Sequence, residues 1–241
     1  MPDRIAFRNR AHEVSRLEAF SDVIFGFAIS LLVVSLEAPK NYEELIEMMR
    51  GFLPFAICFF LFIDCWFEHH HFFKRYALQD NTTIVLNTAL LFVVLFYVYP
   101  LKFMFTTMIR GLLHQETGGV TPARMPTLFT IYGLGFAAVF LVLTAMYTHA
   151  WRRRGALQLN EVERIDTLES IFDNLCTGMF GIISTLLANT SAGLRWAGLV
   201  YFLLVVPKTL VPSVMGHKRR RAEVRMRAER DVEVAGVPSP A

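Results

Sequence analysis

Six long, nearly uninterrupted runs of apolar residues limit what this chain can fold into. Each run approaches or exceeds the roughly 17–25 residues that an α-helix needs to cross about 30 Å of hydrocarbon. The second run does so only if residues 45–49 belong to it. Because backbone groups within a bilayer must bond inside their own segment, such runs predict helices. The sequence therefore predicts an all-α, polytopic membrane protein with six transmembrane helices. The runs are Leu17–Leu36, Phe52–Phe67, Ile84–Met108, Leu128–Tyr147, Leu168–Ala188 and Leu194–Val214.

The composition agrees with a membrane protein. Of the 241 residues, 54% are hydrophobic and 19% are charged, whereas about 25% of the residues in a typical soluble domain are charged. The three cysteines, Cys58, Cys65 and Cys176, fall inside predicted spans, so we expect them to be reduced and structural. A cleavable signal peptide is not expected, because the first apolar run is too long and no small-residue cleavage site follows it. The net charge of +3 gives no sign of a nucleic-acid partner.

The distribution of basic residues predicts that both termini are cytoplasmic. With the N-terminus inside, only six of the 24 Lys and Arg residues fall in outer segments, as the positive-inside bias requires. We therefore expect a multi-pass protein of the cell membrane, with a six-helix transmembrane domain at 1–216 and a basic cytoplasmic tail at 217–241. The basic cluster Lys218–Arg221 indicates either a topology anchor or a site for anionic lipid headgroups. The six outer residues are Lys40, Arg50, Lys102, Arg110, Arg124 and Arg195.

The first apolar run has two different faces when it is drawn as a helix. At about 100° per residue, six side chains lie within about 60° of one direction, while Asp22 points about 140° away from Phe27. Gly26 and Ile29 lie on the side of Asp22. Either the six side chains line a narrow pore and Asp22 faces neighbouring helices, or they make ordinary helix packing with Gly26 at a close contact. The six are Phe20, Val23, Phe27, Ser30, Leu31 and Val34.

The chain has no internal repeat that would supply a second pore-lining helix. The segment Arg16–Asp22 occurs once, and a single unit of six helices is small for a complete ion pathway. If the first helix lines a pore, several subunits must contribute it. Because most homo-oligomers have closed symmetry, a ring is the expected assembly.

Polar residues in the first three predicted helices resemble one known family. The first helix contains the pattern Arg-x-x-x-Phe-Ser-Asp, and the second ends with Trp-x-x-His-His. In type, order and spacing, these residues are similar to the prokaryotic and endolysosomal potassium channels of the transmembrane protein 175 family. The later helices agree with this family only in length and placement. The residues that carry the resemblance are Arg16, Phe20, Ser21, Asp22, Trp66, His69, His70, Asp80, Asn87 and Pro100.

This resemblance implies a function, an assembly and a set of site residues. The first helices of four subunits line the pore in that family, so it implies a homotetrameric, potassium-permeable cation channel with no cofactor besides the permeating K⁺. It implies a constriction at Phe27, Leu31 and Val34, with Phe27 innermost, and a contribution of Ser30 to potassium preference. The family usually has Ile or Leu at the position of Phe27. The implied inner polar network is Arg16, Phe20, Ser21, Asp22, Trp66, His69, His70 and Asn87.

Residues alone leave other functions open. No backbone-carbonyl filter sequence is present, so potassium preference does not follow from the residues, whereas an apolar constriction gates by dewetting. A secondary transporter of a small cation or solute is the alternative, although no inverted repeat is visible. An intramembrane enzyme would need a nucleophile–base arrangement, and none is found. Asp64, Glu68 and His71 share a helical face, but they do not match a zinc motif, so no metal site is expected.

Two groups of ionisable residues carry further hypotheses. A histidine among 69–71 that titrates at about pH 6–7 would make conduction pH-sensitive. At the start of the fifth run, Asp166, Glu169 and Asp173 indicate either an interfacial helix start, where the helix dipole favours acids, or a vestibule that attracts cations.

Overall fold

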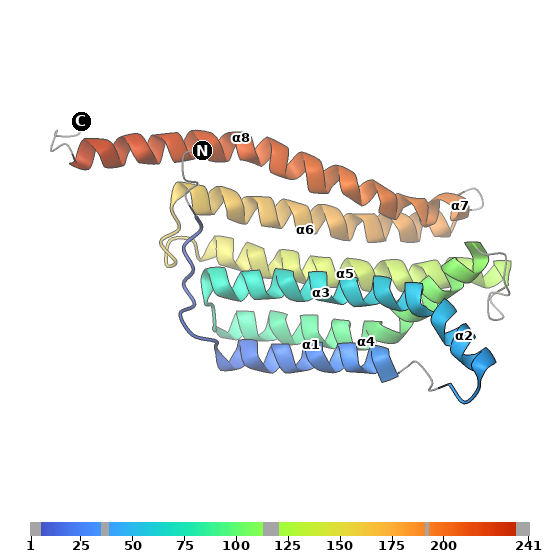
Figure 1. Cartoon of the computed structure of the whole chain (residues 1–241). Coiled ribbons are helices and arrows are strands. Elements are labelled where there is room, and N and C mark those ends of the chain that lie inside the picture. Colours follow the sequence, from blue (N-terminus) through green and yellow to red (C-terminus); the bar gives the residue numbers. More distant parts are fainter. Residues whose placement is uncertain (1–5, 35–38, 113–120, 191–192, 235–241) are drawn as a thin grey trace.

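Long helices that lie side by side make up the molecule (Figure 1). This computed structural model describes residues 6–34, 39–112, 121–190 and 193–234, and every regular element within them is helical. Five helices are long and apolar enough to cross a membrane, namely α1 (Arg16–Val34), α3 (Phe52–Tyr76), α4 (Asn81–Leu112), α5 (Met125–Arg152) and α6 (Glu161–Ala188). The other elements are α2 (Tyr42–Arg50), η1 (Pro122–Arg124), α7 (Leu194–Ala197), η2 (Leu199–Leu204) and α8 (Val205–Val234).

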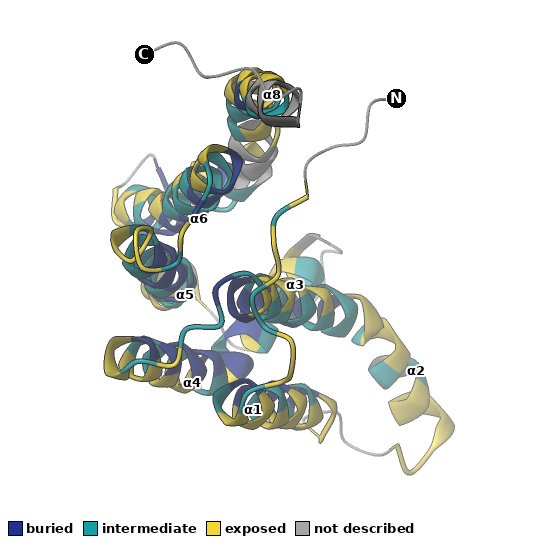
Figure 2. Ribbon diagram, turned by 90° about the vertical axis from the view of Figure 1, so that its left-hand side faces the viewer, coloured by how far each residue is buried: buried dark blue, intermediate teal, exposed yellow. Residues whose placement is uncertain are grey.

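An end-on view shows how the helices are arranged (Figure 2). α4, α5, α6 and α8 follow one another in a curved row, and α1 and α3 pack beside α4. Among the described elements, α1 contacts only α3 and α4. Its buried side chains belong to the same apolar core as those of α3, α4 and α5, which includes Phe25, Phe72, Leu90 and Leu143. The exposed side of α1 faces away from this core.

A short turn at residues 77–80 joins α3 to α4. Ala77 adopts a left-handed conformation with φ 49°, and its amide donates to the Phe73 carbonyl at 2.8 Å. This arrangement closes the end of α3 as the left-handed C-cap commonly does. Asp80 then caps α4, because its Oδ1 accepts hydrogen bonds from both the amide and the hydroxyl of Thr83. The turn therefore holds the adjoining ends of α3 and α4 together.

Two glycines bring α5 and α6 close together. A Cβ atom on Gly181 of α6 would lie 2.5 Å from the carbonyl oxygen of Gly133 and 2.9 Å from the backbone nitrogen of Ala137, both in α5. Small residues of this kind let membrane helices approach at backbone distance. The backbones of α5 and α6 are thus in direct contact at Gly133 and Gly181.

The second predicted helix differs from the structure at both ends. Residues 45–49 lie in the separate helix α2, and the turn at Gly51, whose amide donates to the Met48 carbonyl, divides it from α3. Glycine disfavours a helix interior, which explains the break. At the other end, α3 continues through His71 to Tyr76 instead of ending at the histidines. Phe72, Phe73 and Tyr76 are buried there, and this packing extends the helix.

The sixth predicted span, Leu194–Val214, is not a single helix. It comprises α7, η2 and the first third of α8, which then continues to Val234. Glycines at 193 and 198 flank α7, and Pro207 lies in the first turn of α8, where its missing amide donor costs least. Five spans are therefore supported by length and composition, and a sixth stays a prediction. The predicted domain boundary at 216 lies within α8, and residues 235–241 lie outside the described residues.

Candidate pore helix and its polar support

A stripe of α1 faces away from the rest of its own chain. Phe20, Val23, Phe27 and Val34 are 57%, 70%, 55% and 75% exposed, and Ser30 is exposed between them. Leu31 is half-buried and touches the core at the edge of the stripe. The exposed residues recur at steps of three and four, so they form one line along the helix. No ion pathway within one subunit can use this stripe, because it lies on the outer surface of the chain.

The opposite side of α1 is buried against α3 and α4. Glu18, Ser21, Phe25, Ala28 and Leu32 form this side, and they also recur at steps of three and four. The two polar members lie near the N-terminal end, while the apolar members follow toward the C-terminal end. The α1 helix therefore presents polar groups to its own subunit at one end and apolar groups along the remainder.

Asn87 of α4 joins α1 to α3 through its side-chain amide. Its Nδ2 donates to Ser21 Oγ at 2.8 Å, and its Oδ1 lies 2.8 Å from His69 Nε2. Because an amide oxygen only accepts, His69 donates from Nε2. The Ser21 hydroxyl in turn donates a hydrogen bond to the Leu17 carbonyl at 2.8 Å. Ser21, His69 and Asn87 are fully buried, so these bonds hold three helices at a site without access to solvent.

A second polar contact lies beside the first. Trp66 Nε1 donates to Asp22 Oδ1 at 2.8 Å, and the Trp66 ring stacks on His70 with centroids 5.5 Å apart. His70 Nδ1 is 3.3 Å from Glu18 Oε1. Asp22 and Glu18 thus each connect α1 with α3, and both avoid the exposed stripe.

The structure does not gather every residue that the sequence placed in the network. The side chain of Arg16 has no ion pair or hydrogen bond with any other described residue, and Phe20 belongs to the exposed stripe. Glu18 was not among the sequence candidates, although it is 4% exposed and faces His70. Its spacing of three from Ser21 and seven from Phe25, which places it on the buried side of the helix, is the signal that would have found it.

Asp80 connects the turn between α3 and α4 to the end of α5. His149 Nε2 and Arg153 Nη2 lie 2.8 Å and 3.0 Å from its Oδ2. Burial would raise the pKa of Asp80, but hydrogen bonds from Thr83 and His149 outweigh burial and lower the pKa to about 2. The carboxylate is therefore ionised at neutral pH and serves as a fixed acceptor between two parts of the bundle.

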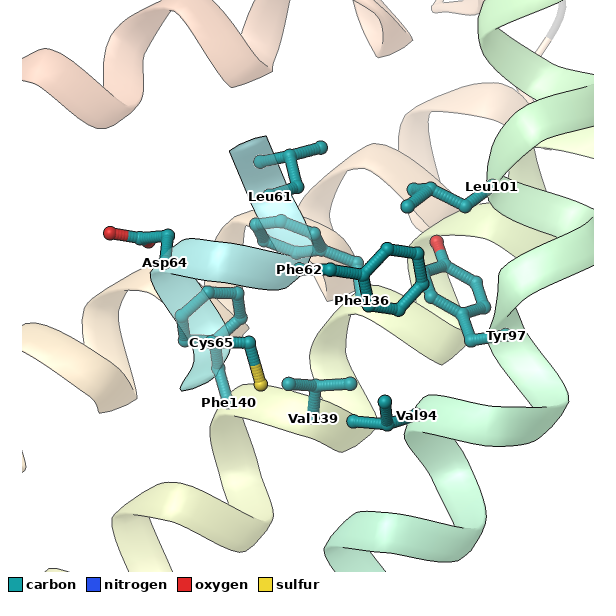
Figure 3. Close-up of a pocket in the computed structure, with 10 residues that line it drawn as sticks. All are labelled: Leu61, Phe62, Asp64, Cys65, Val94, Tyr97, Leu101, Phe136, Val139 and Phe140. Atoms are coloured by element: carbon teal, nitrogen blue, oxygen red, sulfur yellow. The ribbon is translucent and has the colours of Figure 1, made fainter. Parts of the chain in front are cut away.

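The two acidic residues of α3, Asp64 and Glu68, lie in different surroundings. Among the described residues, no group of three or more His, Cys, Asp or Glu side chains is arranged to hold a metal ion. Glu68 accepts a hydrogen bond from the Tyr147 hydroxyl at 3.2 Å. Asp64 lies at the rim of a small pocket of about 40 Å³ between α3, α4 and α5, and its carboxylate points away from the other lining side chains (Figure 3). Because those side chains are nearly all apolar, this pocket suits no ion.

A larger, polar hollow of about 1380 Å³ lies between α3, α5, α6 and α8. Both signs of charge line it: Asp166 pairs with Arg219 of α8 at 2.8 Å, and Glu169 and Arg75 lie nearby. Among the acidic residues of α6, Asp166 therefore holds α8 against α6. The hollow is separated from the exposed stripe of α1 by α3.

Together these features define a polytopic α-helical membrane protein whose first helix turns an apolar stripe away from its own subunit and a polar side toward α3 and α4. The family described as "Endosomal/lysosomal potassium channel TMEM175" matches residues 16–100. A protein of Marivirga tractuosa named "Potassium channel" is 38% identical over 229 residues, which cover 89% of this chain and 93% of that protein. The chain belongs to the TMEM175 family.

Solved structures agree with this assignment. The potassium channel MtTMEM175, solved as a T38A variant in complex with a nanobody–MBP fusion, superposes with a TM-score of 0.77 at 35% identity. It covers 89% of this chain and 100% of its own. A TMEM175 homologue from Chamaesiphon minutus, described as a lysosomal potassium-selective channel homologue, superposes with a TM-score of 0.56 at 22% identity over 83% of this chain and 99% of its own. The second likeness extends to the fold alone.

Proposed function

We propose that this chain is a potassium-permeable channel, in which α1 from each of four identical subunits lines the pore. The observation that carries the proposal is the division of α1 into two sides. Its polar N-terminal side is held by α3 and α4, and its apolar stripe is left for contacts outside the subunit. Family membership and the potassium channels among the relatives support K⁺ as the permeating ion. A passive pore of this kind catalyses no reaction and needs no cofactor.

The stripe suits an apolar constriction with one polar ring. Phe27, Leu31 and Val34 would narrow the pore, and an apolar narrowing blocks ions by excluding water unless it widens. Ser30 lies between them, and its hydroxyl donates to the Gly26 carbonyl at 2.9 Å. With its proton engaged by the backbone, the Ser30 oxygen has lone pairs to offer a cation. We therefore assign Ser30 as the polar ring of the pore.

The chain has further features that fit a channel of the cell membrane. α7, η2 and the beginning of α8 together would provide a sixth crossing, which places both termini on one side. The described ends of the chain do lie toward the same end of the bundle (Figure 1). Residues 1–216 would then form the channel domain, and 217–241 a cytoplasmic extension. Its described part continues α8, and exposed Lys218, Arg220 and Arg221 would meet anionic lipids.

Potassium flux through purified protein in liposomes tests the proposal. The Phe27→Ala change removes most of the predicted constriction and should increase the flux severalfold. Phe92→Ala is the matched control, because Phe92 is 69% exposed on α4, away from the stripe of α1, and it should leave the flux unchanged. Flux that Phe27→Ala and Phe92→Ala change equally would contradict the assigned pore.

Two outcomes separate the channel from a secondary transporter. A channel gives passive flux that increases with the potassium gradient without coupling to a second solute, whereas a transporter gives saturable, coupled flux. Native mass spectrometry of the detergent-solubilised protein should show a tetramer. A monomer that still conducts would contradict a pore lined by several copies of α1.

A further inference from the structure

A short non-helical segment connects α1 to the far side of the bundle. Residues 6–15, here called the strap, run from α1 across the end of α3 toward α6 (Figure 1). The backbone amides of Arg10 and Ala11 both donate to the Lys74 carbonyl, at 3.1 Å and 3.3 Å. Phe7 packs edge-on against Tyr76 with ring centroids 5.6 Å apart. The strap is therefore fixed to the end of α3 by backbone and side-chain contacts.

One carboxylate of α6 holds the strap. Glu163 is completely buried and receives the Arg8 backbone amide at 3.0 Å, Arg8 Nε at 3.1 Å and Arg10 Nη2 at 2.8 Å. It also accepts the Asn160 amide at 3.1 Å as part of the capping box of α6. The Arg10 side chain is only 17% exposed, whereas that of Arg8 is 57% exposed. Removing one partner of the Glu163–Arg10 pair would leave the other charge buried without compensation, which makes this contact hard to break.

Both arginines extend this anchor to the neighbouring loop. Arg8 Nη2 donates to the Gln158 carbonyl at 2.6 Å, and Arg10 Nε donates to the Leu157 carbonyl at 3.0 Å. Arg10 Nη1 reaches the Arg75 carbonyl of α3 at 3.3 Å. Because a guanidinium presents several donors in a fixed plane, Arg10 binds α3, the loop before α6 and Glu163 at once.

The strap is the connection between α1 and α6. Among the described elements α1 packs only on α3 and α4, while α6 packs on α5, α7, η2 and α8. The strap leaves α1 at Ser15 and is bound to the end of α3, one of the two helices that the buried side of α1 faces. The strap therefore restrains the N-terminal end of α1 on the side of its own subunit, away from the stripe.

We propose that Glu163, by holding Arg8 and Arg10, is a positioning residue for conduction. It keeps the N-terminal ends of the α1 helices drawn back from the pore axis, and its loss lets them approach one another and narrow the pathway. This inference rests on the proposed function, since the direction of the effect follows from α1 lining the pore. Glu163 touches neither the stripe nor the permeating ion, so it acts through the strap.

Single-channel recording in planar bilayers tests this role. Glu163→Gln keeps a side chain that completes a capping box, so α6 still begins correctly, but it removes the charge that holds both arginines. Because hydrogen bonds to charged groups are strong, we expect the open probability to fall about tenfold. The unitary conductance should stay unchanged, since the pore-lining side chains are intact. A merely structural defect would reduce the number of channels instead.

Matched variants isolate the strap. Glu161→Gln removes a carboxylate two residues earlier in α6, whose partner at 3.7 Å is Arg225 of α8, and it should leave the open probability unchanged. Arg10→Gln changes the strap and leaves the sequence of α6 intact, so it should lower the open probability in the same direction as Glu163→Gln. The double variant should show little further loss, because both changes break one interaction. Equal open probability in wild type and Glu163→Gln, or an increase, would overturn the proposal.

Spin labels measure the position of the strap independently of ion flux. Glu13, which is exposed, is changed to Cys in a Cys176→Ser background, because Cys58 and Cys65 are buried and do not react. Distances between the labels of one assembly should be single and long in wild type, and shorter and broader in Glu163→Gln. Unchanged distances would overturn the proposal. A wild-type protein that passes no potassium would instead contradict the proposed function. The distances between the spin labels would still show whether Glu163 fixes the position of the strap.

Discussion

The Asn87 side chain of α4 forms hydrogen bonds with both α1 and α3. Replacing it should therefore lower the stability of the folded protein. Replacing it with Leu roughly keeps the volume but leaves His69 Nε2 buried without a partner and removes the donor to Ser21 Oγ. A buried unsatisfied polar group costs about 1–3 kcal/mol, so Asn87→Leu should lower the thermal unfolding temperature markedly. Thr88→Ala is the control, because Thr88 is exposed and bonds only to the Ile84 carbonyl of its own helix. An Asn87→Leu variant as stable as Thr88→Ala would contradict this role.

Asp80 makes the stability of the folded protein depend on pH in the acidic range. Its pKa is about 2 against an ordinary 3.8, so the folded state binds a proton less readily than the unfolded state. The stability that the ionised carboxylate contributes is therefore complete above about pH 4 and is lost as the pH falls toward 2. We expect Asp80→Asn to melt lower than wild type at pH 6, and the difference between the two to shrink between pH 4 and 3. A constant difference across this range would contradict the assignment.

At the scale of elements, the close approach of α5 and α6 depends on Gly181. Adding one methyl group there would place it 2.5 Å from the Gly133 carbonyl oxygen, and backbone atoms cannot move aside cheaply. Gly181→Ala should therefore destabilise the bundle by about 1–3 kcal/mol through overpacking. Gly216→Ala is the matched control, since no atom lies within 4 Å of the added group, and it should be neutral or slightly stabilising. Chemical denaturation in detergent measures both.

The sequence predicts the long helices well because apolar length alone identifies them. Five of the six apolar runs correspond to single long helices, and the resemblance to the family led to the polar residues that meet between α1, α3 and α4. The part of these residues in conduction stays a prediction. The prediction of a single helix for the sixth run differs from the structure, in which residues 194–204 form two short helical pieces before α8. Length and apolarity do not indicate such a division. Glycines at 193 and 198 and Pro207 were the local signals.

Tertiary partners explain what the sequence could not predict. Glu163 reads as an ordinary acidic residue at a helix start, and its role depends on Arg8 and Arg10, which lie more than 150 residues away in the chain. Charges near an apolar run are commonly interpreted as topology or targeting signals, so the sequence indicates no specific partner for these arginines. The spacing of Glu18 from Ser21 and Phe25 indicates its burial, but only the tertiary structure shows that its partner is His70.

At the scale of the whole molecule, the pathway exists only if several copies of α1 surround one axis. In the proposed tetramer, four Ser30 side chains would converge on the axis, whereas Phe92, which is exposed on a different helix, α4, would not line it. We expect a Ser30→Cys channel in the Cys176→Ser background to lose nearly all potassium flux on addition of silver ions, because soft thiolates that converge bind a soft metal tightly. Phe92→Cys in the same background should be insensitive, since its thiols would lie outside the proposed pore. The buried Cys58 and Cys65 should not respond in either variant. Equal sensitivity of the two variants would place Ser30 away from the axis, and the exposed stripe of α1 would then have to face lipid.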